Sequence, residues 1–163
     1  KHVGSNYAPS WKNMKKKTLT VISLLFKQLF FNGTIIFFFS ILQFYWSMRE
    51  FSDSLSSACL KCPFLEDVFL FSLISTFSLI FIFHFCSLIK NRLIKIIIEF
   101  LSLITIWSLW NYSIFNSRES SWSTYLFNEE IHYIIYLSYF PILILSTISI
   151  FIINSNIKKT KQT

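Results

Sequence analysis

Four long apolar stretches, separated by short polar segments, dominate the pattern of residues along the chain. They run from Leu24 to Tyr45, from Val68 to Ile89, from Ile94 to Ser113 and from Ile131 to Ile153. Each holds about 20 residues, and a helix of that length crosses a hydrocarbon core about 30 Å thick. The pattern therefore predicts an all-α fold, an integral membrane bundle of four transmembrane helices.

The rest of the chain leaves room for little else. Of its 163 residues 53% are hydrophobic, which is more than soluble domains usually carry. We expect a polar basic N-terminal segment at 1–17, a single four-span domain at 18–157 and a basic tail at 158–163. The abundance of phenylalanine and isoleucine and the scarcity of glycine are typical of a low-GC genome.

Small residues normally let transmembrane helices approach closely, and this chain has only two glycines. Gly33, in the first span, is expected to allow a kink or a close contact. Elsewhere serine and threonine must take the place of glycine and alanine. In the second and fourth spans the candidates for helix contacts are Ser72, Ser75, Thr76, Ser78, Ser146, Thr147 and Ser149.

Basic residues lie almost entirely on one side of the spans. Twelve of the fifteen lysines and arginines fall before or in the first span, between the second and third, or at the chain end. The segments 46–67 and 114–130 instead carry seven of the eight acidic residues. Because basic loops stay inside, both termini are predicted on the cytoplasmic or matrix side of a bacterial or organellar inner membrane.

The same placement bears on partners. A net charge of +7 can indicate nucleic-acid binding, but here the basic residues sit at span ends and form no stripe on a folded surface. We therefore expect no nucleic acid. The expected partners are the lipid bilayer and other membrane-protein subunits or further copies of the chain.

Two features predict how the spans are arranged. Lys90-Asn91-Arg92 separates the second and third spans so briefly that these must form a tight antiparallel hairpin. Pro141, inside the fourth span, is expected to kink that helix near mid-membrane.

Ionisable residues interrupt the hairpin at similar depths. His84 lies in the second span and Glu99 in the third, with Lys95 four residues before Glu99 on the same helix face. A carboxylate inside the hydrocarbon core is costly unless another side chain pairs with its charge. One interpretation is a Lys95–Glu99 pair that holds the hairpin together, with a neutral His84 hydrogen-bonded nearby. The other is a proton or ion relay, or a pH-sensitive gate, built from all three residues.

The motif Cys59-Leu60-Lys61-Cys62-Pro63 precedes the second span. Cysteines at i and i+3 of a turn are close enough for a disulfide. We expect Pro63 at the first helical position and Cys62 at the N-cap, where the helix dipole and Lys61 favour a thiolate. Cys86 is expected to be a buried apolar side chain. Two cysteines and His132 are too few ligands for zinc, so no metal site is predicted.

The chain resembles the DsbB family of disulfide-forming membrane proteins in two respects. It has four predicted spans with both ends inside, and it carries Cys59, Lys61 and Cys62 before the second span. The resemblance implies a thiol oxidoreductase with Cys59 and Cys62 as the redox pair and a quinone as acceptor. That family has a second cysteine pair in the second outer loop, whereas residues 114–130 contain no cysteine. An arginine expected shortly after the first pair is also absent, and Glu66 and Asp67 occupy that stretch.

Three functions follow from these features. With no nucleophile constellation, phosphate-binding glycine loop or paired catalytic carboxylates, the leading hypothesis is a non-enzymatic subunit or accessory protein of a membrane complex, without a cofactor. The first alternative is the quinone-linked thiol oxidoreductase. The second is a small proton-coupled carrier or channel that uses Glu99 and His84.

Overall fold

All the regular structure in the described part of the chain is helical. The computed structural model describes the backbone of residues 10–160 and, among them, the side chains of Ser23 and residues 26–155. The basic side chains predicted at 1–17 and 158–163 lie outside these described side chains. The elements are α1 (Ser10–Met48), the short 3-10 helix η1 (Arg49–Phe51), α2 (Phe64–Cys86), α3 (Arg92–Arg118), a second 3-10 helix η2 (Ser120–Trp122) and α4 (Phe127–Thr160).

The prediction of four spans is confirmed in its coarse form. Four helices are long and apolar enough to cross a membrane, within Phe26–Phe51, Phe64–Cys86, Arg92–Trp122 and Phe127–Ser155. These segments extend beyond most ends of the predicted stretches. The added residues are largely polar and aromatic, and such residues continue a helix where a span meets the headgroup region.

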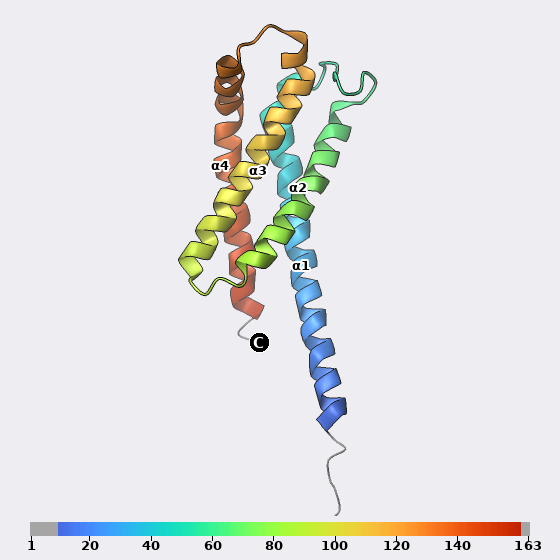
Figure 1. Ribbon diagram of the computed structural model, residues 1–163, viewed down its shortest axis with the longest axis vertical. Helices are drawn as coiled ribbons and strands as arrows, with labels where there is room; N and C mark the ends of the chain where they lie inside the picture. The colour runs from blue at the N-terminus through green and yellow to red at the C-terminus, as the bar shows by residue number, and fades with distance from the viewer. Residues whose placement is uncertain (1–9, 161–163) are drawn as a thin grey trace, which may run out of the picture.

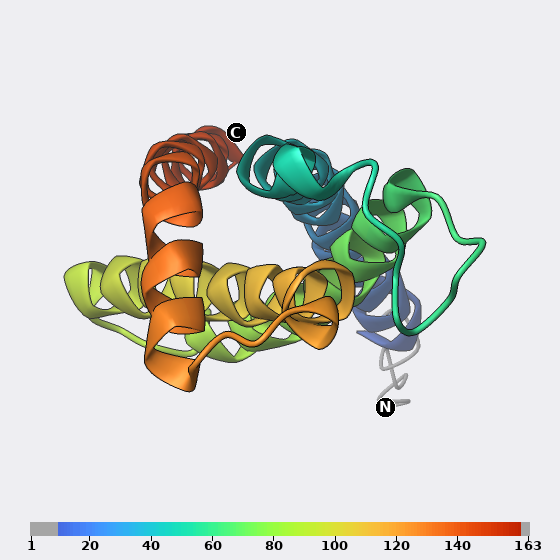
Figure 2. The ribbon, with the colours of Figure 1, turned by 90° about the horizontal axis from the view of Figure 1, so that it is seen from above.

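The four helices form a ring. Helix α1 packs against α2 and α4, and α3 packs against the same two helices. Figure 1 shows that α1 begins and α4 ends toward the same end of the bundle as the connection 87–91, which we call the turn end. The opposite end, the loop end, carries residues 49–63 and 119–126. Figure 2, which views the bundle from above, shows the first turns of α4 from the side and its last turns nearly end-on. The helix therefore changes direction along its length.

Hydroxyl side chains occupy much of the interior of the bundle. Ser72, Ser75 and Thr76 of α2 and Ser146 and Ser149 of α4 are buried, as expected from their sequence positions. Ser78 is half-buried and Thr147 is exposed. Several of the buried hydroxyls donate to the carbonyl one turn earlier, which satisfies them without a partner helix. The small serine side chain thus does the spacing work that glycine and alanine do in other bundles.

A tryptophan and two amides complete the interior. Trp107 is fully buried, and its indole N–H donates a 2.9 Å hydrogen bond from α3 to the hydroxyl of Ser40 on α1. One turn further toward the loop end lie Gln43 and Asn111, which are also fully buried. The amide of Gln43 donates to Ser47 at 2.8 Å. Polar side chains therefore lie within a largely apolar core, and the Trp107–Ser40 hydrogen bond links α3 to α1 there.

Gly33 marks the close approach of α1 and α2. A Cβ atom placed there would lie 2.7 Å from Cδ1 of Ile80 and 3.9 Å from a methyl group of Thr76. Gly33→Ala should cost about 1 kcal/mol or less, because only the flexible tip of Ile80 must move, whereas Gly33→Leu should cost about 2 kcal/mol by overpacking. Unfolding in detergent micelles measures both values. Adding Ile80→Ala should recover part of the Gly33→Leu loss, and an undiminished loss in the double variant would contradict this contact.

Candidate functional site

The two cysteines of the motif are joined in the structure. Cys59 and Cys62 form a disulfide with their Cα atoms 5.4 Å apart, and the amide of Cys62 donates to the carbonyl of Cys59 at 3.2 Å. Both side chains are half-buried. Cys86, at the end of α2, is free and buried.

The predicted helix start is wrong by one residue. Helix α2 begins at Phe64, and Pro63 stands at the N-cap with an extended backbone (φ −65°, ψ 151°). Cys62 therefore lies one position before the cap. A residue that precedes proline is driven toward extended backbone, so the chain straightens here before the helix begins. The helix-dipole argument for a Cys62 thiolate, which assumed an N-cap position, does not apply to this geometry.

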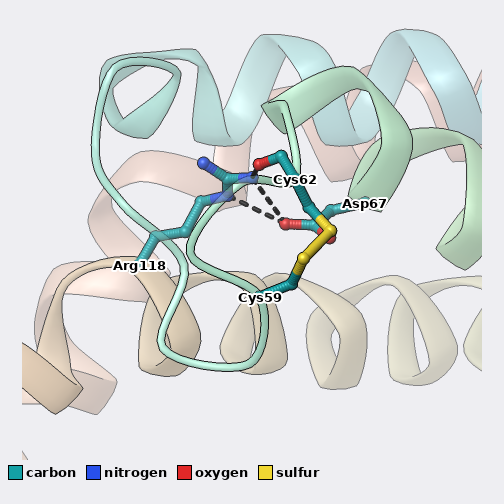
Figure 3. The surroundings of a disulfide bond; sticks show 4 residues. All are labelled: Cys59, Cys62, Asp67 and Arg118. Atoms are coloured by element: carbon teal, nitrogen blue, oxygen red, sulfur yellow. Dashed lines mark hydrogen bonds and ion pairs between the residues drawn. A yellow bond between two sulfur atoms is a disulfide. The ribbon is translucent and has the colours of Figure 1, made fainter.

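A buried arginine from the far end of α3 holds this loop. Figure 3 shows the Arg118 side chain reaching the Cys62 carbonyl and Asp67 beside the disulfide. Its Nε and Nη2 donate to Oδ2 of Asp67 at 2.9 and 2.7 Å, Nη1 donates to the Ser54 carbonyl at 2.7 Å, and Nη2 donates to Cys62 at 3.2 Å. The guanidinium also lies over the ring of Phe64, 5.3 Å from its centroid. With 1% of its side chain exposed, Arg118 joins the first loop, α2 and α3.

Hydrogen bonds also tie the first loop to the second. The amide of Ser57 donates to the carbonyl of Ser117 at 2.7 Å, and its hydroxyl donates to that of Ser121 at 3.2 Å. The indole N–H of Trp122 donates to the carbonyl of Leu55 at 2.9 Å. We call these contacts together with those of Arg118 the loop clasp. They give two segments more than fifty residues apart in sequence one common structure.

The side chains of an aromatic cluster pack against one another at the loop end. The ring of Phe115 lies 5.4 Å from that of Phe51, 5.6 Å from Tyr133 and 5.8 Å from Tyr125, measured between centroids. Burial raises the pKa of Tyr125 above its ordinary value, and the carboxylate of Glu119 adds to the rise. These rings join η1, α3, the second loop and α4 into one layer.

Two acidic side chains in the first turn of α4 make hydrogen bonds that hold the start of this helix in place. Glu129 accepts a hydrogen bond from the amide of Leu126 at 2.9 Å, which caps the helix start. Glu130 is 9% exposed and accepts from the hydroxyls of Tyr112, at 3.4 Å, and Ser120. These contacts attach the beginning of α4 to α3 and to the second loop.

The ionisable residues predicted within the second and third spans form a second candidate site at the turn end. Lys95 and Glu99 make an ion pair of 3.5 Å within α3. Glu99 is buried, and its second oxygen accepts from the amide of Asn154 on α4 at 3.4 Å. The pair thus connects α3 to α4, whereas the sequence interpretation expected a link across the α2–α3 hairpin.

His84 lies at the same site with a different environment. It is exposed, and among the described residues no hydrogen bond joins its ring to Lys95 or Glu99. All three predicted residues nevertheless line one cavity of about 80 Å³ between α1, α2 and α3. The other polar groups in its wall are Gln28, Asn32 and Ser87.

Sequence reasoning missed two residues that organise these sites. Arg118 was counted only as a basic residue of an outer loop, although it and Asp67 are opposite charges at the loop-side edges of two predicted spans. Such a pair at one membrane depth is a usable signal for contact. Asn154 was missed because it lies at the edge of the fourth apolar stretch, beyond Ile153.

Neither site has the ligands of a metal centre. Within the part of the chain that the structure describes, no group of three or more histidine, cysteine, aspartate or glutamate side chains could hold a metal ion. No family model, no curated protein and no solved structure matches this chain.

Proposed function

We propose that the chain is a non-enzymatic subunit or accessory protein of a membrane complex, and that it docks onto a neighbouring protein through its loop end. The loop clasp is the observation that carries this proposal. The loops are held both by a buried arginine with four hydrogen bonds and by a disulfide. A simple connection between two helices does not need so many restraints. Preorganised loops bind partners with a smaller entropic cost than mobile ones, which favours a recognition surface.

The composition of the loop end supports docking. Large apolar side chains project from the clasped loops, with Leu60 61% and Leu126 69% exposed. Trp122 is exposed in part while its indole N–H is bonded to Leu55. Apolar and aromatic side chains amid polar ones are typical of the centre of an interface. The surrounding charge is mainly acidic, which favours a partner with a basic surface.

The proposal includes an orientation. Seven of the eight acidic residues lie at or near the loop end, and the turn end carries Lys27, Lys90, Arg92 and Lys95. Under the positive-inside rule the turn end faces the cytoplasm or matrix and the loop end faces outward. We further propose that Pro141, which lies inside α4, sets the change of direction of that helix.

A substitution at the exposed centre of the loops tests docking. Leu60→Asp should reduce copurification of the partner from native membranes in mild detergent by at least about tenfold, which corresponds to about 1.4 kcal/mol. Leu88→Asp, a matched change at an exposed leucine of the turn end, should leave it unchanged. Equal recovery with both variants would contradict docking at this surface. Substrate turnover or transport by the purified chain alone would remove the proposal altogether.

The thiol oxidoreductase remains the second candidate, because the Cys59–Cys62 disulfide is half-exposed on a loop. The surrounding residues fit a quinone poorly. Four of the five N–H groups of Arg118, the buried cation beside the disulfide, already donate to Asp67, Ser54 and Cys62. The arrangement favours a disulfide that shapes the loop over one that exchanges electrons.

A further inference from the structure

The cavity at the turn end is too large and too polar to be an ordinary packing defect. Its volume of about 80 Å³ exceeds several-fold the roughly 10–15 Å³ that one water molecule needs. Leu29, Ile80 and Phe83 supply its apolar part. The polar part consists of two amides, a hydroxyl, an imidazole and an ion pair: Gln28, Asn32, Ser87, His84 and Lys95 with Glu99.

Most of these polar groups are hydrogen-bond donors that reach the surface. Gln28, Asn32 and Lys95 are half-buried, while His84 and Ser87 are exposed. Lys95 has three N–H donors, and Glu99 lies near its ammonium at 3.5 Å. Glu99 itself is 2% exposed and also accepts from Asn154, so it forms the back of the site. Its role is to position the Lys95 ammonium, whose remaining donors are available to a ligand.

Charge around the cavity favours an anion. Lys27, Lys90 and Arg92 are exposed at the same end of the bundle. Glu99 is the one acidic residue of the described chain at this end, because the other seven lie in or beside the loops of the loop end. Basic pockets between transmembrane helices near the cytoplasmic surface attract the headgroups of anionic lipids.

Apolar side chains beside the cavity extend the site toward the lipid. Phe26 and Phe30 of α1 are each 72% exposed, and Phe81 and Phe85 of α2 are 66% and 53% exposed. These residues neighbour the lining positions of the same two helices along the sequence. An acyl chain would find apolar surface next to the polar cavity, which a free anion would not use.

We propose that this cavity binds the phosphate group of an anionic phospholipid, with Lys95 as its principal cation, the Asn32 and Gln28 amides as further donors, and the neighbouring phenylalanines in contact with the acyl chains. The site belongs to a single chain and is independent of the loop clasp. A bound lipid there would fill the space between α1 and the α2–α3 pair and so hold the ring of helices together at this end.

Native mass spectrometry of the delipidated full chain in detergent tests the proposal. Dioleoylphosphatidylglycerol should add as one tightly bound molecule, and Lys95→Met should weaken its binding about tenfold. Lys90→Met, a lysine of the same end that does not line the cavity, should change binding less than about twofold. Equal effects of the two substitutions would overturn the site. The double variant Lys95→Met/Glu99→Gln leaves no unpaired buried charge, and it should show the same loss if Lys95→Met alone does not fold.

Two further probes separate the possible sources of the phosphate. Dioleoylglycerol, which has the same acyl chains and no phosphate, should not bind at the site. Inorganic phosphate at millimolar concentration should displace little of the phospholipid. Equal binding of dioleoylglycerol would show an apolar site, and full displacement by inorganic phosphate would show a site for a free anion. Either result would overturn the proposal.

Discussion

Replacing Arg118 with leucine is expected to destabilise the loop end by about 3 kcal/mol while the four helices remain formed. Breaking a buried ion pair by removing one partner typically costs about 3–5 kcal/mol, and the lower value applies because Asp67 is 19% exposed. The substitution also leaves the carbonyls of Ser54 and Cys62 without their donor. Denaturant unfolding in micelles measures the loss, and limited proteolysis within residues 52–63 locates it.

Two further variants make this result specific. Arg49→Leu removes an exposed arginine near the same loops and should cost less than about 0.5 kcal/mol. Asp67→Asn combined with Arg118→Leu should be less damaging than Arg118→Leu alone, because the carboxylate no longer lacks a partner. Equal losses for Arg118→Leu and Arg49→Leu would show that the clasp does not hold the loops.

Trp107→Ala is expected to cost about 3–5 kcal/mol, the usual range for a large aromatic side chain removed from a core. Trp107 is fully buried, and it also supplies the hydrogen bond to Ser40. Trp107→Phe keeps most of the volume and loses the indole donor, so it should cost about 1 kcal/mol. Trp46→Ala, at a tryptophan that is 42% exposed, serves as the matched control. A loss as large for Trp46→Ala would contradict a bundle centred on Trp107.

The spans could be predicted because their signal is local. A stretch of about 20 apolar residues identifies a membrane helix without knowledge of its neighbours. The inward position of Ser72, Ser75 and Ser146 could also be anticipated, since in a chain with two glycines few other small residues remain for helix contacts. No position was predicted for Gln43 and Asn111, which are amides within apolar stretches, and their full burial is a finding of the structure.

The candidate sites depend on contacts between residues far apart in the sequence, and the local pattern of apolar and polar residues does not reveal such contacts. Arg118 and Asp67 are 51 residues apart in sequence, and Glu99 and Asn154 are 55 apart. Only the packing of α2, α3 and α4 brings these pairs together. The start of α2 was misplaced for a local reason, because Pro63 suits both the first helical position and the N-cap, and its extended ψ decides between them.

The proton-coupled carrier stays a prediction. In its favour, buried polar residues continue along α3 beyond Glu99, at Trp107, Asn111 and Arg118. Against it, Leu103 interrupts this series, and Glu99 is already engaged by Lys95 and Asn154. A proton path needs groups that exchange partners, whereas Glu99, Trp107 and Arg118 are each held in fixed contacts.

If the loop clasp is the docking surface that we propose, the Cys59–Cys62 disulfide is a fixed structural part of it. The most direct test is the redox state of this pair in native membranes, measured by alkylating free thiols before and after reduction and following the mass shift. We predict a fully oxidised pair whose state does not change when quinone reduction is blocked. A mixed population that shifts when quinone reduction is blocked would contradict the claim and make the thiol oxidoreductase the better account.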